Sequence, residues 1–176
     1  LDNNDMLGLA GYGQVGYGPA EHPNELSWLT ENLDTIRDKV SGLQAGQWTI
    51  YTNIAQGIDK GVDVLFNSPN GRTAASRVMI LLTDGNANQT RPNPTEYNLS
   101  QARLDALAAA QDARDLGIRI YTISVGAESD TDLMEQIAEI GAGEWYHAEG
   151  SIAAVSAQLN EIFQNVGGRR SVVLIR

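Results

Sequence analysis

The stretch RVMILLTDGNAN, residues 77–88, joins an almost unbroken apolar run to an abrupt polar end. Residues 78–83 have the length and apolar content of a strand buried on both faces, as in a parallel sheet covered by helices. In such open sheets, ligands bind outside the carboxyl ends of the strands. Asp84 follows the strand directly, so we expect its carboxylate at the functional edge of the sheet.

Two side chains near this edge have ordinary local explanations that compete with a functional one. Asp84 and Gly85 form a common turn pair, so the aspartate could simply begin a turn. Thr52 stands directly before a predicted helix, where a threonine most often accepts backbone hydrogen bonds as the N-cap. Taken separately, neither residue establishes a binding site.

Strands and helices alternate along the rest of the chain. Long helices between apolar strands predict an α/β fold with a doubly wound, mostly parallel sheet and helices on both faces. The length fits a single domain over residues 1–176. Expected strands cover 6–12, 78–83, 118–126, 144–148 and 171–176, and expected helices cover 33–43, 53–66, 99–116, 133–140 and 152–166.

Composition and charge exclude several functions. The 176 residues carry 22 acidic and 12 basic side chains, a formal charge of -10 that disfavours binding to nucleic acid or to an anionic lipid surface. The absence of cysteine excludes disulfides, thiolate nucleophiles and cysteine-ligated metal sites. No apolar run approaches the roughly 20 residues that span a bilayer, so membrane attachment would need a segment outside this chain.

A dinucleotide-binding pattern fails on its context. GYGQVG, residues 11–16, has the spacing of the glycine fingerprint and follows a predicted strand, with Asp34 downstream. The fingerprint requires a helix that begins at the third glycine and points its N-terminus at the pyrophosphate. Pro19 and Pro23 follow instead and prevent such a helix, so nucleotide binding is not expected.

Enzymatic patterns are equally weak. His22 and His147 are the only histidines, and neither has a sequence spacing typical of a metal pair or a catalytic triad. We expect His147 to pack in a strand beside Trp145. An aspartyl-phosphate enzyme would carry a second aspartate two residues after Asp84, where the chain has Asn86.

Five stretches, taken in order, resemble the von Willebrand factor type A domain: DMLGLAGYG, YTNIAQGI, RVMILLTDGNAN, GIRIYTISVG and GEWYHAEGSIAAVSAQLNEIF. The likeness extends over nearly the whole chain and implies the doubly wound, Rossmann-like sheet of that family. It also implies a metal-ion-dependent adhesion site, which three loops build at the carboxyl-end edge of the sheet. The family's threonine before its second-loop helix matches Thr52, and its strand-end aspartate matches Asp84.

By this resemblance, Thr52 and Asp84 would help to bind Mg²⁺ or Ca²⁺, hard cations that take about six or more oxygen ligands. One coordination position would remain for an acidic side chain of a protein partner. The expected ligand-binding residues around them are Asn53, Gly85, Asn86 and Asn88.

The third loop of the family pattern, Asp-x-Ser-x-Ser after the first central strand, occurs nowhere in the 176 residues. We therefore expect an N-terminally incomplete domain without that strand. Three explanations are open: residues upstream of Leu1, a separate chain, or SVVLIR (171–176) in the vacant position. We favour the first, because SVVLIR also fits the strand that ends such domains. Thr52 and Asp84 alone supply too few oxygens and too little charge for tight metal binding.

The expected function is non-enzymatic protein recognition or adhesion through a divalent cation. DMLGLAGYG, TNIAQGI and IFQNVGGRRSVVLIR resemble bacterial members associated with tight-adherence pilus assembly, which implies an extracytoplasmic location at the cell surface or in the periplasm. Three alternatives stay open: a metal-free, self-assembling element of a surface filament, a cytoplasmic type A domain beside an ATPase, and an enzyme that uses Asp84.

Overall fold

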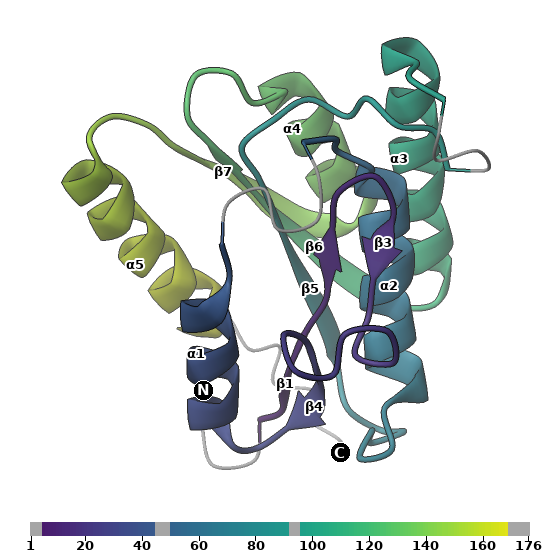
Figure 1. The fold of residues 1–176 in the computed structure, drawn as a ribbon, viewed down its shortest axis with the longest axis vertical. Coiled ribbons are helices and arrows are strands. Elements are labelled where there is room, and N and C mark those ends of the chain that lie inside the picture. Colours follow the sequence, from purple (N-terminus) through teal and green to yellow (C-terminus); the bar gives the residue numbers. More distant parts are fainter. Residues whose placement is uncertain (1–4, 45–49, 92–95, 169–176) are drawn as a thin grey trace, which may run out of the picture.

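In the part of the chain that the structure describes, the main sheet consists of three parallel strands. A computed structural model describes residues 5–44, 50–91 and 96–168 (Figure 1). β5 (Arg77–Thr83), β6 (Ile118–Val125) and β7 (Ala142–Ala148) lie in the order β5-β6-β7. β5 and β6 pair in continuous parallel register over the whole of β5. The strands predicted over 78–83, 118–126 and 144–148 therefore form one sheet.

The N-terminal part forms two smaller antiparallel pairs. β1 (Leu7–Leu9) pairs with β4 (Ser27–Thr30), and β2 (Gly11–Tyr12) pairs with β3 (Gly16–Tyr17). The prediction of one continuous strand over 6–12 is wrong in detail, because Ala10 separates β1 from β2. Neither β3 nor β4 was predicted. β3 has two residues in a glycine-rich turn and β4 lies in a polar stretch, so neither carries a periodic strand pattern.

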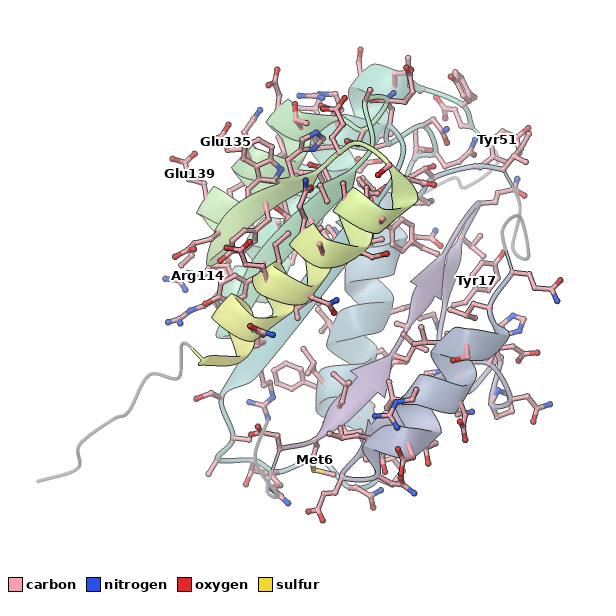
Figure 2. The ribbon with its side chains drawn as sticks, turned by 90° about the vertical axis from the view of Figure 1, so that its left-hand side faces the viewer. Met6, Tyr17, Tyr51, Arg114, Glu135 and Glu139 are labelled. Atoms are coloured by element: carbon pink, nitrogen blue, oxygen red, sulfur yellow. The ribbon has the colours of Figure 1, made fainter. Side chains whose placement is uncertain are left out.

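The helices cover both faces of the main sheet. Helices α2, α3 and α4 share one buried core with β5 and β6, while α5 lies against the opposite face (Figures 1 and 2). This arrangement confirms the predicted α/β class, and the predicted bounds of the helices are correct to within two residues. The helices in the described residues are α1 (Leu33–Gly42), α2 (Ile54–Asn67), α3 (Leu99–Asp115), α4 (Thr131–Ile140) and α5 (Ile152–Gly168).

Two sequence expectations concern the ends of the chain and membranes. The strand predicted over 171–176 lies outside the described residues. Every helix in the described part of the chain is too short or too polar to cross a lipid bilayer.

Helix α3 packs through a row of alanines. These side chains are almost completely buried and recur at helical spacing, so the backbone of α3 can lie close to α2 and to β6. This row explains how α3 can pack between α2 and α4 in the core, although its two faces differ little in hydrophobicity. The residues are Ala102, Ala106, Ala109, Ala110 and Ala113.

Helix α2 contacts both groups of strands. A Cβ atom on Gly8 of β1 would lie 2.5 Å from Val64 Cγ1 on α2. A Cβ atom on Gly61 of α2 would lie 2.6 Å from Met79 Cε on β5. Small residues at these positions let α2 lie directly against β1 and β5, although the two strands belong to separate sheets.

The aromatic ring of Tyr12 requires a glycine at position 57 of α2. A Cβ atom there would lie 2.6 Å from Tyr12 Cδ1, so Gly57→Ala should displace the ring and lower the free energy of unfolding by about 1–3 kcal/mol. Gly42→Ala on α1 meets no atom within 4 Å and should be neutral or slightly stabilising, because alanine is the better helix former. Urea unfolding measures both changes, and equal destabilisation by the two variants would contradict this packing.

Candidate functional site

The two loops singled out by the sequence meet at the carboxyl end of β5. Thr52 directly precedes Asn53, the N-cap of α2, and Asp84 directly follows β5. A Cβ atom on Gly85 would lie 3.5 Å from Thr52 Oγ1, so the threonine hydroxyl is adjacent to the Asp84–Gly85 turn. The structure thus brings together the loop of Thr52 and the loop of Asp84, two residues that are 32 positions apart in the sequence.

Asn88 fixes the Thr52 loop to the loop after β5. The Thr52 amide donates a hydrogen bond of 2.8 Å to Asn88 Oδ1. In return the Asn88 amide donates one of 3.0 Å to the Thr52 carbonyl, which also accepts from the Gln89 amide at 3.4 Å. These bonds hold the two loops side by side. Asn88 therefore orients the site by fixing the backbone of Thr52.

Asn53 is a structural anchor beneath the site. Its side chain is 0% exposed, and its Oδ1 accepts the hydrogen bond from the Gln56 amide that caps α2. Its Nδ2 donates to the carbonyls of Gln14 and Thr90. The capping role considered for Thr52 therefore belongs to Asn53, which leaves the Thr52 hydroxyl outside the cap. Asn53 positions its neighbour from a buried place.

Asp84 is exposed to solvent at the end of β5. Among the described residues, no hydrogen bond or ion pair involves its carboxylate, whereas the buried Thr83 hydroxyl accepts a hydrogen bond of 3.3 Å from the Gly85 amide and shapes the turn. Asn86 extends the edge, since its Nδ2 donates to the Glu128 carbonyl in the loop after β6 at 3.2 Å. The carboxylate thus lies at the surface of a turn held by other groups.

Tyr12 is a member of this site that sequence reasoning missed. Its hydroxyl donates a hydrogen bond of 2.5 Å to the Leu82 carbonyl. Burial raises the pKa of Tyr12 to about 12; the nearby Asp84 charge also raises it, and a hydrogen bond with the Thr83 side chain lowers it. A single tyrosine in a glycine-rich turn does not form a sequence spacing typical of ligand residues. The one feature of the sequence that could have suggested Tyr12 is an aromatic residue between two glycines.

The oxygen donors fit part of a hard-cation site. Thr52 and Asp84 provide one hydroxyl and one carboxylate, the donor types that Mg²⁺ and Ca²⁺ prefer. Within residues 5–44, 50–91 and 96–168, no group of three or more His, Cys, Asp or Glu side chains could hold a metal ion. These two residues therefore supply donor types for two of the about six positions that such a cation takes.

A serine, a histidine and a carboxylate line up elsewhere, at the ends of β6 and β7. Ser124 Oγ lies 3.0 Å from His147 Nδ1, and His147 Nε2 lies 3.3 Å from Glu149 Oε2. Sequence spacing did not suggest this group; the parallel pairing places Ser124 opposite His147. Ser124 is 0% exposed, and its oxygen also accepts a hydrogen bond from Trp145 Nε1 at 2.9 Å. A substrate cannot reach it, so the group braces the strands.

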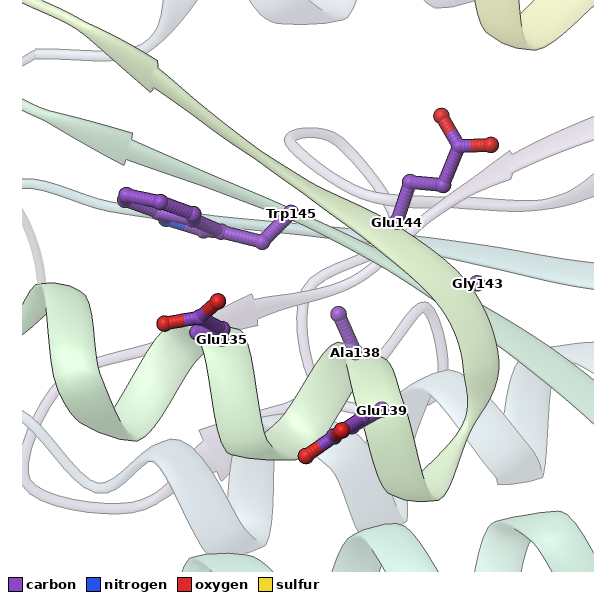
Figure 3. A pocket seen from close by; sticks show the side chains of 6 residues that line it. All are labelled: Glu135, Ala138, Glu139, Gly143, Glu144 and Trp145. Atoms are coloured by element: carbon purple, nitrogen blue, oxygen red, sulfur yellow. The ribbon is translucent and has the colours of Figure 1, made fainter.

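An open hollow of about 310 Å³ lies between α4 and the edge strand β7 (Figure 3). The Trp145 ring and the Glu135 carboxylate face one another there, whereas Glu144 extends to the other side of β7. None of the predicted site residues lines it. The lining residues are Glu135, Ala138, Glu139, Gly143, Glu144 and Trp145.

A parallel sheet with helices on both faces defines an α/β domain of the Rossmann-like class (Figure 1). The model of the von Willebrand factor type A domain matches residues 3–165, and the chain belongs to this family. The resemblance inferred from the sequence is thereby confirmed. No curated protein matches the sequence.

Solved structures show the same fold at low sequence identity. Proximal thread matrix protein 1 from the mussel byssus is 15% identical, with a TM-score of 0.64 over 90% of this chain and 36% of that one. The von Willebrand factor domain of the type V pili tip protein Mfa5 from Porphyromonas gingivalis is 16% identical, with a TM-score of 0.61 over 96% and 82%. This chain thus spans about a third of the mussel protein structure.

A further structure of the mussel protein contains a zinc-occupied MIDAS motif, the metal-ion-dependent adhesion site of this family. It is 15% identical to this chain, with a TM-score of 0.63 over 89% of this chain and 35% of that one. At this identity the likeness shows the fold.

The raised pKa of Tyr12 predicts a loss of stability in alkali. The folded protein keeps this proton at pH values where the unfolded chain has lost it, so the free energy of unfolding falls as pH rises from about 10 to about 12. A shift of two pH units corresponds to at most about 2.7 kcal/mol. Tyr12→Phe should reduce this pH dependence in urea unfolding and remove one late step from the tyrosine absorbance titration. Tyr97→Phe, at an exposed position, is the control, and identical behaviour of both variants would contradict the assignment.

Proposed function

We propose that the chain is a non-enzymatic protein-recognition domain whose partner-binding surface is the edge of the sheet around Thr52 and Asp84. A divalent cation, Mg²⁺ or Ca²⁺, would be held there in part by the Thr52 hydroxyl and the Asp84 carboxylate. When bound, such a cation supplies a positive charge and an open coordination position for an acidic side chain of the partner. Gly85, Asn86 and Asn88 would shape the surface around it.

One observation carries this proposal: the Thr52 hydroxyl lies beside the Asp84–Gly85 turn while the Asp84 carboxylate has no described hydrogen-bond or ion-pair partner. A turn residue alone would not require a neighbouring hydroxyl from another loop. The bonds between Thr52 and Asn88 hold the backbone of the Thr52 loop beside the loop after β5, and they use neither the Thr52 hydroxyl nor the Asp84 carboxylate. Such preorganisation lowers the cost of binding a cation or a partner.

The charge of the chain gives the cation a specific role. A formal charge of -10 repels an acidic partner by long-range electrostatics. A divalent cation beside Asp84 would reverse the sign of the local potential and allow a carboxylate to approach. Recognition of an acidic side chain at this edge should therefore depend on the cation.

The biological setting belongs to the same proposal. Structural neighbours include the pilus tip protein Mfa5, the pilus adhesin SpaC from Lactobacillus rhamnosus GG and a protein of the mussel byssus. Domains of this family generally serve adhesion or interaction, and nothing indicates catalysis. We propose an extracytoplasmic location in a bacterial cell-surface or pilus-assembly protein.

Metal titration tests the oxygen donors directly. Calorimetry on the 176-residue chain should show only weak Mg²⁺ or Ca²⁺ binding, with Kd no tighter than about 10⁻⁴ M, since two fixed oxygens leave most positions to water. Asp84→Asn should abolish the signal, and Asp38→Asn at an exposed position on α1 should leave it unchanged. Submicromolar affinity, or equal effects of the two substitutions, would refute this assignment.

Partner binding provides the functional test. A displayed peptide library, screened on the immobilised chain with 5–10 mM Mg²⁺ or Ca²⁺ (roughly 50- to 100-fold above a Kd of about 10⁻⁴ M), should yield ligands that contain Asp or Glu. Their binding should fall at least about tenfold with a chelator or with Asp84→Asn, a change of about 1.4 kcal/mol. Asp38→Asn should bind like the unchanged chain. Selection of peptides without acidic residues, or binding that resists the chelator, would contradict cation-dependent recognition.

The shortage of described metal ligands favours a second candidate, a metal-free element that assembles into a surface filament. In that case the exposed edges of the sheets would make the contacts, as unpaired strand edges commonly do. Asp84→Asn would then leave self-association intact, and a chelator would have no effect on it. Sedimentation of the chain with and without chelator distinguishes this candidate from the first.

A further inference from the structure

The hollow between α4 and β7 has an aromatic wall, the indole ring of Trp145 (Figure 3). Trp145 pairs in register with Thr122 of β6, whose hydroxyl donates a hydrogen bond of 2.7 Å to the Met134 carbonyl on α4. Because paired residues of neighbouring strands point to the same face of a sheet, Trp145 points toward α4. Its Nε1 donates a hydrogen bond of 2.9 Å to Ser124 Oγ. The ring is therefore held in a fixed orientation, and it is only partly buried.

Two carboxylates of α4 form the opposite wall. Glu135 and Glu139 are about one helical turn apart and exposed, and Figure 3 shows the Glu135 carboxylate facing the ring. Within the described part of the chain, no hydrogen bond or ion pair involves either carboxylate. Like charges at this spacing repel one another, and Glu139 also lies in the last turn, at the negative end of the helix dipole. A bound cation would relieve both unfavourable interactions.

A ring opposite two carboxylates fits a planar organic cation. Cations bind the face of an aromatic ring, and tryptophan binds them best. A guanidinium group can stack flat on an indole while the N–H groups in its plane donate to carboxylates. None of the six lining residues, all of them in the described ranges, is basic and could supply this charge from within. The formal charge of -10 adds a long-range attraction for a basic partner.

The size of the hollow favours one side chain of a larger partner over a free small molecule. Its volume of about 310 Å³ lies at the lower end for ligand sites, which enclose most of their ligand, whereas this hollow is open. A free small molecule would lose its translational freedom for few contacts. A protein partner can add contacts outside the hollow, along α4 and along β7, the terminal strand in the order β5-β6-β7.

We propose that the hollow between α4 and β7 binds an arginine side chain of a protein partner, with the guanidinium group stacked on Trp145 and bonded to Glu135 and Glu139. This surface is separate from the edge around Thr52 and Asp84, because its lining residues come from α4 and β7. It therefore does not depend on the function proposed for that edge. The two surfaces would recognise side chains of opposite charge.

An NMR titration with matched peptides tests the recognition of charge. The probe is a blocked pentapeptide with arginine between glycines, and its control carries citrulline, the neutral isostere of arginine. The arginine peptide should shift the indole N–H signal of Trp145 and the amide signal of Gly143 saturably. Its Kd should be on the order of 10⁻³ to 10⁻² M, since one ring and two exposed carboxylates each contribute little. The indole signal of Trp28 on β4, which does not line the hollow, should stay unchanged.

Three outcomes of this titration would overturn the proposal. The first is an equal shift with the arginine and citrulline peptides, which would show that the charge is not recognised. The second is binding of methylguanidinium without binding of the arginine peptide, which would indicate a site for a small molecule. The third is a bound peptide without transferred NOEs between its arginine δ protons and the Trp145 indole, because stacking on the ring requires them.

Matched double substitutions assign the two carboxylates. Glu135→Gln with Glu139→Gln keeps the size of both side chains, removes their charges and should weaken binding of the arginine peptide at least about threefold. Asp38→Asn with Glu161→Gln removes the same net charge at exposed positions of α1 and α5 and should leave the Kd within about 1.5-fold of the unchanged chain. Equal weakening by the two double variants would show attraction by net charge alone and would overturn the assignment.

Discussion

Contact of α2 with two separate sheets is the constraint on which the rest of the structure depends. The described strands of the N-terminal part share no backbone pairing with the β5-β6-β7 sheet. Their positions are set by α2, which lies directly against β1 and β5 because glycines occupy the points of closest approach. The N-terminus of the same helix carries Thr52 and Asn53 to the end of β5. One helix therefore fixes both the architecture and the candidate site.

Groups that hold the candidate site differ from those that would bind through it. Asn53 and Asn88 use their amides to tie backbone segments together, and Asn53 is fully buried. The proposed ligand groups are different ones, the Thr52 hydroxyl and the Asp84 carboxylate. In the proposed site, the hydrogen bonds that position the loops would thus be made before any partner arrives.

Periodicity predicted the elements that are long and evenly patterned, and failed where a structure arises from short contacts. β5 has an almost unbroken apolar run and α3 a long alanine-rich stretch, and both extend over enough residues to be predicted closely. β3 has two residues and no periodic signal. The proximity of Thr52 and Asp84 could be expected from the family resemblance, whereas Tyr12 enters the site through tertiary packing on Gly57. The group of Ser124 and His147 likewise depends on strand register, which no local pattern encodes.

The alanine row of α3 determines how the core responds to load. An alanine has no side-chain rotamers to lose on burial, so α3 meets its neighbours at almost no side-chain entropy cost. On the α3 side, this interface contains no side chain that can change rotamer, so a shift of α2 must be taken up by the larger side chains of α2 or by the backbone of α3. A pull applied at the Thr52 end of α2 would therefore act against a helix that cannot yield by a change of rotamer.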